Sequence, residues 1–120
     1  MRLLVTGALG DLGRAVVTAA LARGHRVRLF DRPGWRSRLA LARHRRRWPR
    51  GNLEVQLGDI RDGAAVAQAV AGQDCVFHGA AILAPASERD PALSRAVNVD
   101  GTRHVLTALQ AELGRRAALG

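Results

Sequence analysis

Three glycines at three-residue spacing follow a short apolar run close to the amino terminus. The run is Leu3-Leu4-Val5, and the glycines are Gly7, Gly10 and Gly13. A run with helical periodicity begins at Asp11, directly after the second glycine. One glycine allows the tight turn out of a strand, a second lets the backbone approach a phosphate, and a third lets the helix pack close to the strand. The pattern is therefore typical of a dinucleotide-binding loop between a strand and a helix.

We assign the whole loop to phosphate binding, because its free N–H groups and the positive end of the helix macrodipole would face the phosphates. The assigned residues are Gly7, Ala8, Leu9, Gly10, Asp11, Leu12 and Gly13. The alternative is a glycine-rich corner with no ligand, since a single match of this kind is weak. The strand before the loop, the helix after it and Asp31 further along favour the binding interpretation.

The chain has 120 residues, which predicts one domain with one core. No apolar run approaches the roughly 20 residues that span a bilayer, and the amino terminus has no signal-peptide layout. We therefore expect a cytoplasmic protein with no membrane partner. Its one cysteine, Cys75, excludes an internal disulfide framework and is expected to be a small core residue.

The formal net charge is +9, and all 19 basic residues are arginines, because the chain contains no lysine; it contains no tyrosine either. No acidic residue lies between Asp31 and Glu54, and the stretch 36–48 is expected to be a very basic helix. With Trp35 and Trp48 at its ends, this stretch could bind nucleic acid through phosphate contacts and stacking. We favour the simpler interpretation of a solvated outer face over a nucleic-acid partner.

Strand-like and helix-like segments alternate along the chain. The expected strands cover 2–5, 25–30, 53–57 and 74–78, and the expected helices cover 11–23, 36–48, 64–71 and 92–113. This alternation predicts an α/β fold with right-handed crossovers. We expect a Rossmann-like doubly wound parallel sheet in the order 3-2-1-4, truncated after about four strands.

Polar or small residues mark the carboxyl end of each expected strand. The glycine loop follows the first strand and Asp31 ends the second, while Asp59-Ile60 and His78-Gly79-Ala80-Ala81 follow the third and fourth. Ligands of open α/β sheets bind outside these strand ends. The four segments are therefore expected to meet at one site.

Taken together, these motifs resemble those of the extended short-chain dehydrogenase/reductase family, in its NAD-dependent epimerase/dehydratase group. The resemblance covers about residues 1–113. The matching segments are Thr6-Gly7-Ala8-Leu9-Gly10-Asp11-Leu12-Gly13, Asp31, Gly58-Asp59-Ile60-Arg61-Asp62, His78-Gly79-Ala80-Ala81 and Asn98-Val99-Asp100-Gly101-Thr102. The ordered set is more specific than the glycine loop alone.

The resemblance implies a role for each matching residue. Asp31 would hold the adenosine ribose, Asp59 and Ile60 would contact the adenine, and Ala80 and Ala81 would line the path to the nicotinamide ribose. Asn98 would contact the active-site region or fix a helix kink. Simpler alternatives remain: Asp59 as the cap of a turn, Asn98 as a surface amide, and His78 as a satisfied strand-end histidine rather than an acid or base.

The residues around Asp31 leave two cofactors open. The Asp31 carboxylate favours NAD, because it would repel the 2′-phosphate of NADP. Arg32, with Arg36 and Arg38 nearby, could instead bind that phosphate. We expect NAD, with NADP as the alternative.

The family's chemistry uses a Tyr-x-x-x-Lys pair, and this chain has neither residue type. We assign no catalytic residue and no metal ligand, and the substrate stays open. We expect the NAD(P)-binding portion of an oxidoreductase or a nucleotide-sugar epimerase/dehydratase-like protein, incomplete at its carboxyl end and inactive alone. The tail 114–120 stands where a fifth strand would begin but lacks β-branched residues. The alternative is a non-catalytic dinucleotide-binding or redox-sensing module that acts through a partner.

The expected strand 74–78 would be left at the edge of the sheet. Its unpaired N–H and C=O groups could pair with another chain. We therefore expect self-association through this edge.

Overall fold

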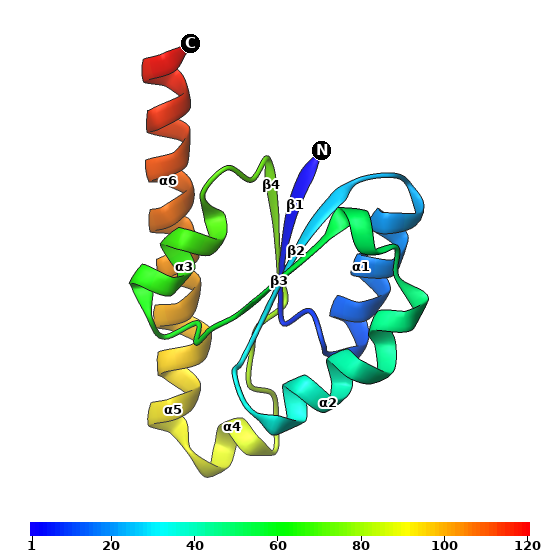
Figure 1. The fold of residues 1–120 in the computed structure, drawn as a ribbon. Helices are drawn as coiled ribbons and strands as arrows, with labels where there is room; N and C mark the ends of the chain where they lie inside the picture. The colour runs from blue at the N-terminus through cyan, green and yellow to red at the C-terminus, as the bar shows by residue number, and fades with distance from the viewer.

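Four parallel strands form one sheet in the computed structural model, which describes residues 1–120. The strands are β1 (Arg2–Thr6), β2 (Arg26–Asp31), β3 (Leu53–Leu57) and β4 (Cys75–His78). Their order is β3-β2-β1-β4, as the sequence predicts (Figure 1). Val5 of β1 lies opposite Leu29 of β2 and Phe77 of β4. The carboxyl ends of all four strands therefore lie at one end of the sheet.

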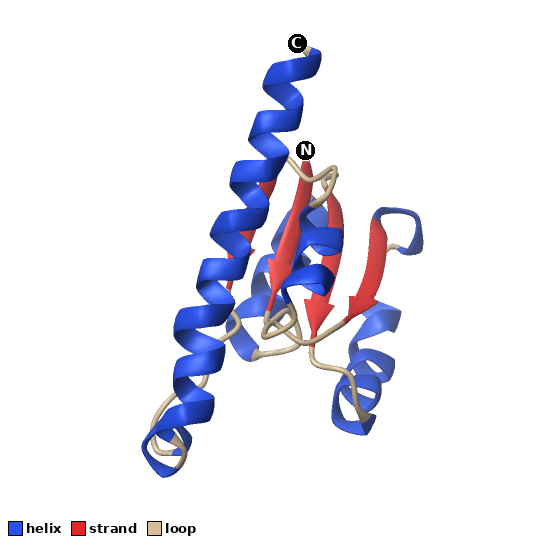
Figure 2. Ribbon diagram, turned by 90° about the vertical axis from the view of Figure 1, so that its left-hand side faces the viewer, coloured by secondary structure: helices blue, strands red, loops and turns tan.

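Helices cover both faces of this sheet (Figures 1 and 2). They are α1 (Asp11–Ala22) and α2 (Trp35–His44) on one face, and α3 (Gly63–Val70) and α6 (Gly101–Leu119) on the other. Side chains alternate along a strand, so Leu4 packs under α3 and α6 while its neighbour Val5 packs under α1. The sheet thus separates two apolar layers, which explains why β1 is apolar on both faces.

The segment between β4 and α6 contains three short helical pieces. They are α4 (Ala86–Arg89), α5 (Pro91–Arg95) and the π-helical turn η3 (Ala96–Asp100). The Asp90 side chain accepts a hydrogen bond from the Leu93 N–H and so caps α5. α5, η3 and α6 follow one another without a break, so the long helix expected over 92–113 is present, with a π-helical turn inside it.

The basic stretch is folded differently from the single helix expected over 36–48. α2 ends at His44 and is followed by two 3₁₀ turns, η1 (Arg45–Arg47) and η2 (Arg50–Asn52). Trp48 is only 5% exposed, and its indole Nε1 donates to Thr18 Oγ1 at 3.0 Å. The expectation that Trp48 could stack on bases is therefore wrong, because this side chain is buried and is hydrogen-bonded to α1.

The carboxyl-terminal helix is longer than the sequence predicts. α6 continues to Leu119, whereas the expected end was residue 113. Gly114 does not end the helix, because the residues after it are mostly good helix formers: Arg115, Arg116, Ala117, Ala118 and Leu119. The tail is thus helical over 114–119 and forms no part of the sheet.

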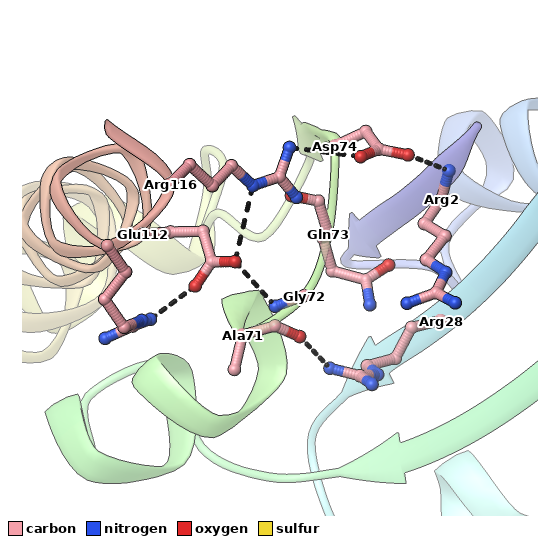
Figure 3. A network of polar contacts seen from close by, with 9 residues as sticks. Arg2, Arg28, Ala71, Gly72, Gln73, Asp74, Glu112 and Arg116 are labelled. Carbon is pink, nitrogen blue, oxygen red and sulfur yellow. Dashed lines mark hydrogen bonds and ion pairs between the residues drawn. The ribbon is translucent and has the colours of Figure 1, made fainter. Parts of the chain in front are cut away.

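A polar network fastens α6 to the turn that precedes β4 (Figure 3). Glu112 accepts from the Gly72 N–H at 3.0 Å, and Arg116 donates to the Gln73 carbonyl at 2.7 Å and to Asp74 at 3.1 Å. Asp74 in turn accepts from the Arg2 N–H at 2.7 Å. Hydrogen bonding from Arg115 is the main cause that lowers the pKa of Glu112. The network therefore joins α6 to the turn before β4 and, through Asp74, to the first residue of β1.

Cys75 is exposed, so its predicted place in the core is wrong. It is the first residue of β4, which is an edge strand of the sheet. The apolar body of β4 lies further along, where Val76 and Phe77 each pack on one of the two apolar layers. None of the helices has the length and apolar character required to cross a bilayer.

Candidate functional site

A groove of about 520 Å³ opens at the carboxyl ends of the strands. The turn after each strand contributes to its lining: Gly7 and Gly10 after β1, Asp31 at the end of β2, Asp59 and Ile60 after β3, and Ala80 and Ala81 after β4. The structure therefore brings together the four segments that the sequence places at one site.

The three glycines of the first loop have different surroundings. Gly7 has a φ of +65°, and a Cβ there would lie 2.6 Å from the carbonyl carbon of Gly79. A Cβ on Gly13 would lie 2.1 Å from the Gly7 oxygen, so α1 requires a glycine there to pack this close. A Cβ on Gly10 would approach only the Gly7 oxygen, at 3.3 Å. Gly10 is therefore the position where the backbone is open toward the groove.

The other loop residues divide between the groove and the exterior. Leu9 lines the groove, whereas Ala8 is buried in the apolar layer under α1. Asp11 and Leu12 are exposed and do not line the groove. Arg14 holds this part of the loop in place, since its guanidinium donates to the Leu9 carbonyl and to Asp11, both at 2.7 Å.

The Asp31 carboxylate joins β2 to the glycine loop. One oxygen accepts from the Leu9 N–H at 2.8 Å, and the other accepts from the Arg32 N–H at 2.7 Å. Each carboxylate oxygen has two lone pairs, so both can still accept from a ligand hydroxyl. Arg32 and Arg36 line the groove beside this carboxylate. The same end of the groove therefore contains one acceptor of hydroxyl groups and two cations.

Asp59 is paired with Arg61 inside the turn after β3. Its carboxylate accepts from the Arg61 N–H at 2.9 Å and from the Arg61 guanidinium at 2.6 Å. This hydrogen bonding is the main cause that lowers the pKa of Asp59. The hydrogen bond from the Arg61 N–H to the Asp59 carboxylate is a turn cap, which is the simpler alternative role given for Asp59 in the sequence analysis. Ile60 is 4% exposed and packs on Gly101 while also lining the groove.

A chain of hydrogen bonds runs from β1 through β4 to α6. Thr102 Oγ1 donates to the Asn98 carbonyl at 2.6 Å, so it accepts from Nε2–H of His78 at 3.0 Å. Nδ1 of His78 is then an acceptor, and the Thr6 hydroxyl donates to it at 2.6 Å. Burial lowers the pKa of His78, which favours this neutral ring. The sequence-based interpretation of a satisfied histidine agrees with these bonds.

Asn98 does not line the groove, but it is hydrogen-bonded to Ile82, which does. Its Oδ1 accepts from the Ile82 N–H at 2.7 Å, and its Nδ2 donates to the Ile82 carbonyl at 2.9 Å. Ile82 lines the groove, as do its neighbours Ala80 and Ala81. Because Asn98 lies in η3, the π-helical turn is joined directly to the loop after β4.

Several groove residues were not assigned from the sequence. Phe30 packs against Gly58 from the end of β2, Leu93 and Val97 reach the groove from α5 and η3, and Ser37 and Ala40 reach it from α2. These residues carry no motif, because their position depends on how the helices pack. Thr6 belongs to the glycine-loop motif, but nothing in the sequence predicts that its hydroxyl contacts Gly79, Ala80 and His78.

The fold and the glycine-lined groove define a Rossmann-type dinucleotide-binding domain. Residues 3–118 match the family model described as "NAD dependent epimerase/dehydratase family". The chain belongs to this family, which confirms the resemblance seen in its motifs.

The relatives and solved structures that resemble this chain are much longer than it is. A 3-beta-hydroxysteroid dehydrogenase of Mycolicibacterium neoaurum is 42% identical over 115 residues, which cover 91% of this chain and 28% of that protein. The structure of Pen from Bacillus thuringiensis has a TM-score of 0.83 at 28% identity, covering 92% of this chain and 34% of that one. A short-chain dehydrogenase/reductase superfamily protein from Agrobacterium tumefaciens with bound NAD has a TM-score of 0.67 at 36% identity, covering 93% of this chain and 30% of that one. The 120 residues thus span about 28% of the first relative.

Proposed function

We propose that this chain binds NAD in the groove and forms the cofactor-binding portion of an oxidoreductase or a nucleotide-sugar epimerase/dehydratase-like protein. The observation that carries the proposal is the backbone opening at Gly10. It lies beside the start of α1, where free N–H groups and the helix macrodipole favour a pyrophosphate. The NAD bound to the Agrobacterium protein supports the same choice of cofactor.

The other groove residues fit the remaining parts of a dinucleotide. Asp31 would accept hydrogen bonds from the adenosine ribose, and Ile60 and Asp59 would contact the adenine. Ala80 and Ala81 leave room for the nicotinamide ribose, because their side chains are small. Bound NAD would supply a hydride acceptor, and the role of these residues is to hold and orient it.

The chain offers no catalytic pair for such a reaction. It contains no tyrosine and no lysine, so a Tyr-x-x-x-Lys acid/base pair cannot come from these residues. We therefore propose that the chain is inactive alone. The same observation favours a second candidate, a non-catalytic dinucleotide-binding or redox-sensing module that acts through a partner.

A thermal-shift titration tests cofactor binding. At ~100 times its dissociation constant, NAD should stabilise the folded chain by about 2.7 kcal/mol. The melting temperature should then rise by at least about 4 °C. In Gly10→Ala the new Cβ would face the groove and meet only the Gly7 oxygen, so the chain should fold but lose the NAD shift.

Gly51→Ala is the matched control, because a Cβ there meets nothing within 4 Å and the residue lies outside the groove. This variant should keep the full NAD shift. An equal shift in Gly10→Ala and Gly51→Ala would place the pyrophosphate elsewhere. A stable chain that binds NAD and copurifies with one defined partner, with no turnover in that complex, would favour the second candidate.

A further inference from the structure

The net charge of the chain is concentrated in one segment, residues 32–50, which we call the basic segment. It contains eight of the 19 arginines and no acidic residue. The other 11 arginines are nearly balanced by the ten acidic residues of the chain. The basic segment therefore carries almost all of the excess positive charge.

The guanidinium groups of this segment have no acidic partner. All six ion pairs of the structure involve arginines elsewhere, such as Arg28 with Glu54 and Arg61 with Asp59. None of the eight guanidiniums donates a hydrogen bond within the chain, and Arg36 stacks on the Trp35 ring at 5.3 Å. Their charge is thus free to act on an external anion.

α2 presents a second apolar strip, on the side away from the sheet. Ala40 and Leu41 pack on the apolar layer under α1. Trp35 and Leu39, one helical turn apart, are instead 70% and 47% exposed, and the exposed Ala42 continues their line. At 3.6 residues per turn, exposed arginines border this strip on both sides: Arg38 on one side, and Arg36 and Arg43 on the other.

The basic segment is anchored to α1 through Trp48, although its arginines make no ion pair. The buried Trp48 indole is hydrogen-bonded to Thr18 of α1, and the His44 ring lies 6.2 Å from the Trp48 ring. α2 lies on the opposite side of the molecule from α6 (Figures 1 and 2). The apolar strip and its arginines therefore form part of the outer surface of the molecule.

We infer that the outer face of α2 docks on an anionic lipid bilayer. Exposed Trp35 and Leu39 would enter the boundary between headgroups and acyl chains, where tryptophan is favoured. The flanking arginines would contact the lipid phosphates, with their aliphatic stems along the apolar strip. Leu39 and Ala42 give no advantage in binding a nucleic acid, and Trp48 is not available for stacking, so the lipid surface fits better. The sequence predicts no membrane partner because it has no spanning run, but a helix that lies on a bilayer needs none.

Vesicle binding tests this inference. The complete chain should cosediment with vesicles of phosphatidylglycerol and phosphatidylcholine but not with phosphatidylcholine alone. Trp35 emission should move to shorter wavelength and be quenched by brominated acyl chains, with buried Trp48 as the internal reference. The double variant Arg38→Glu/Arg43→Glu should bind at least roughly tenfold more weakly. Trp35→Ser/Leu39→Ser should lose the binding that persists at moderate salt.

Arg95→Glu/Arg103→Glu is the matched control. It changes the net charge equally at two exposed arginines that make no ion pair. This variant should bind nearly as well as the unaltered chain. Equal losses of vesicle binding in the two arginine variants, or vesicle binding with no change in Trp35 emission, would show that binding depends only on net charge. Either result would overturn the inference. Salt-resistant binding to a short single-stranded DNA, with none to vesicles, would assign the surface to nucleic acid instead.

Discussion

The Thr6 hydroxyl lies 2.6 Å from Nδ1 of His78 and joins the last residue of β1 to the last residue of β4. The same hydroxyl oxygen accepts from the N–H groups of Gly79 and Ala80, at 3.1 and 3.3 Å. Gly7, the first residue of the glycine loop, follows Thr6 directly. One buried hydroxyl thus connects two of the loops that line the groove.

Replacing Thr6 with Val should destabilise the chain while keeping the shape of the side chain. The Ala80 N–H and Nδ1 of His78 would lose their partner, at a cost of about 1–3 kcal/mol, while the Gly79 N–H would keep its bond to the Thr6 carbonyl. Thermal melts should show the loss as a drop of several degrees. Thr107→Val, at an exposed position of α6, should leave the melting temperature nearly unchanged. Equal melts for the two variants would contradict the role of the Thr6 hydroxyl.

His78 should make the chain less stable in weak acid. Burial lowers its pKa below the ordinary value of 6.5, so the folded state binds a proton less readily than the unfolded state. Above this value both states are neutral. As the pH falls below it, the unfolded state takes up the proton first, and the free energy of unfolding decreases. Protonated His78 would also lose its bond from the Thr6 hydroxyl.

Melts between about pH 7.5 and about pH 5.5 measure this effect, above the range where carboxylates titrate. His44 also has a lowered pKa, through burial and nearby arginines, so His44→Gln is the necessary comparison. Each of His78→Gln and His44→Gln should remove part of the fall in stability below about pH 6.5, and the double variant should remove more than either alone. A pH profile unchanged in His78→Gln would show that the ring does not titrate as described.

Gly7 should be less replaceable than Gly24, although both have a positive φ. The values are +65° and +81°, so an alanine is strained at either position. A Cβ on Gly24 meets nothing within 4 Å, whereas a Cβ on Gly7 meets the Gly79 backbone at 2.6 Å. Gly24→Ala should cost about 1–2 kcal/mol. Gly7→Ala should cost clearly more in denaturant unfolding, and equal costs would mean that the loop after β4 moves aside.

Asp31 should determine the preference between NAD and NADP. Asp31→Asn keeps an oxygen that can accept from the Leu9 N–H but removes the negative charge. NAD should then bind roughly tenfold more weakly, because a charge-assisted hydrogen bond to the ribose is lost. NADP binding should improve, since Arg32 and Arg36 line the groove nearby. Unchanged affinity for both cofactors by calorimetry would mean that Asp31 does not contact the ribose.

β4 should allow the chain to associate with itself. It is an edge of the sheet, and exposed Cys75 lies at its start. Light scattering at micromolar concentration should give a mass above that of a monomer. Cys75→Lys should reduce association, because a charge on an edge strand opposes pairing. Cys75→Ser should not reduce it, which excludes a disulfide, and Ala118→Lys controls for the added charge.

The four strands and the four main helical segments predicted from local pattern are present in the structure, which adds the short pieces α4, η1 and η2. The apolar runs and their glycine ends gave β1 and β3 almost to the residue, and the alternation of strands and helices gave the sheet order. Two errors concern helix ends, since α2 ends at His44 and α6 continues to Leu119. The other errors concern long-range packing. Trp48 is buried because α1 offers Thr18 as a partner, and Cys75 is exposed because β4 lies at an edge. Neither relationship is visible in a local window of sequence.

The residues of the candidate site also fall into two groups, those that the local sequence predicts and those that long-range packing places there. Residues that line the groove through their backbone, such as Gly7 and Gly10, can be recognised in the sequence because they are glycines at a characteristic spacing. Asp59 was recognised as a carboxylate at a strand end, but its pairing with Arg61 depends on the conformation of the turn. Leu93 and Ala40 belong to the groove only because α5 and α2 fold back toward it.

The π-helical turn η3 gives the chain one residue more than an α-helical turn would contain between the same ends. Asn98 in that turn is hydrogen-bonded to Ile82, and Val105, Ala108 and Glu112 of α6 face the rest of the molecule. Removing one residue of η3 other than Asn98 would therefore leave an α-helical turn, with α5 and α6 still on their present faces. Removing one residue from α6 before Val105 would instead rotate everything after it by about 100°, so that its apolar side would turn away from α3 and Glu112 would leave Gly72. The helix can thus give up a residue in its π turn but not in the regular turns that follow.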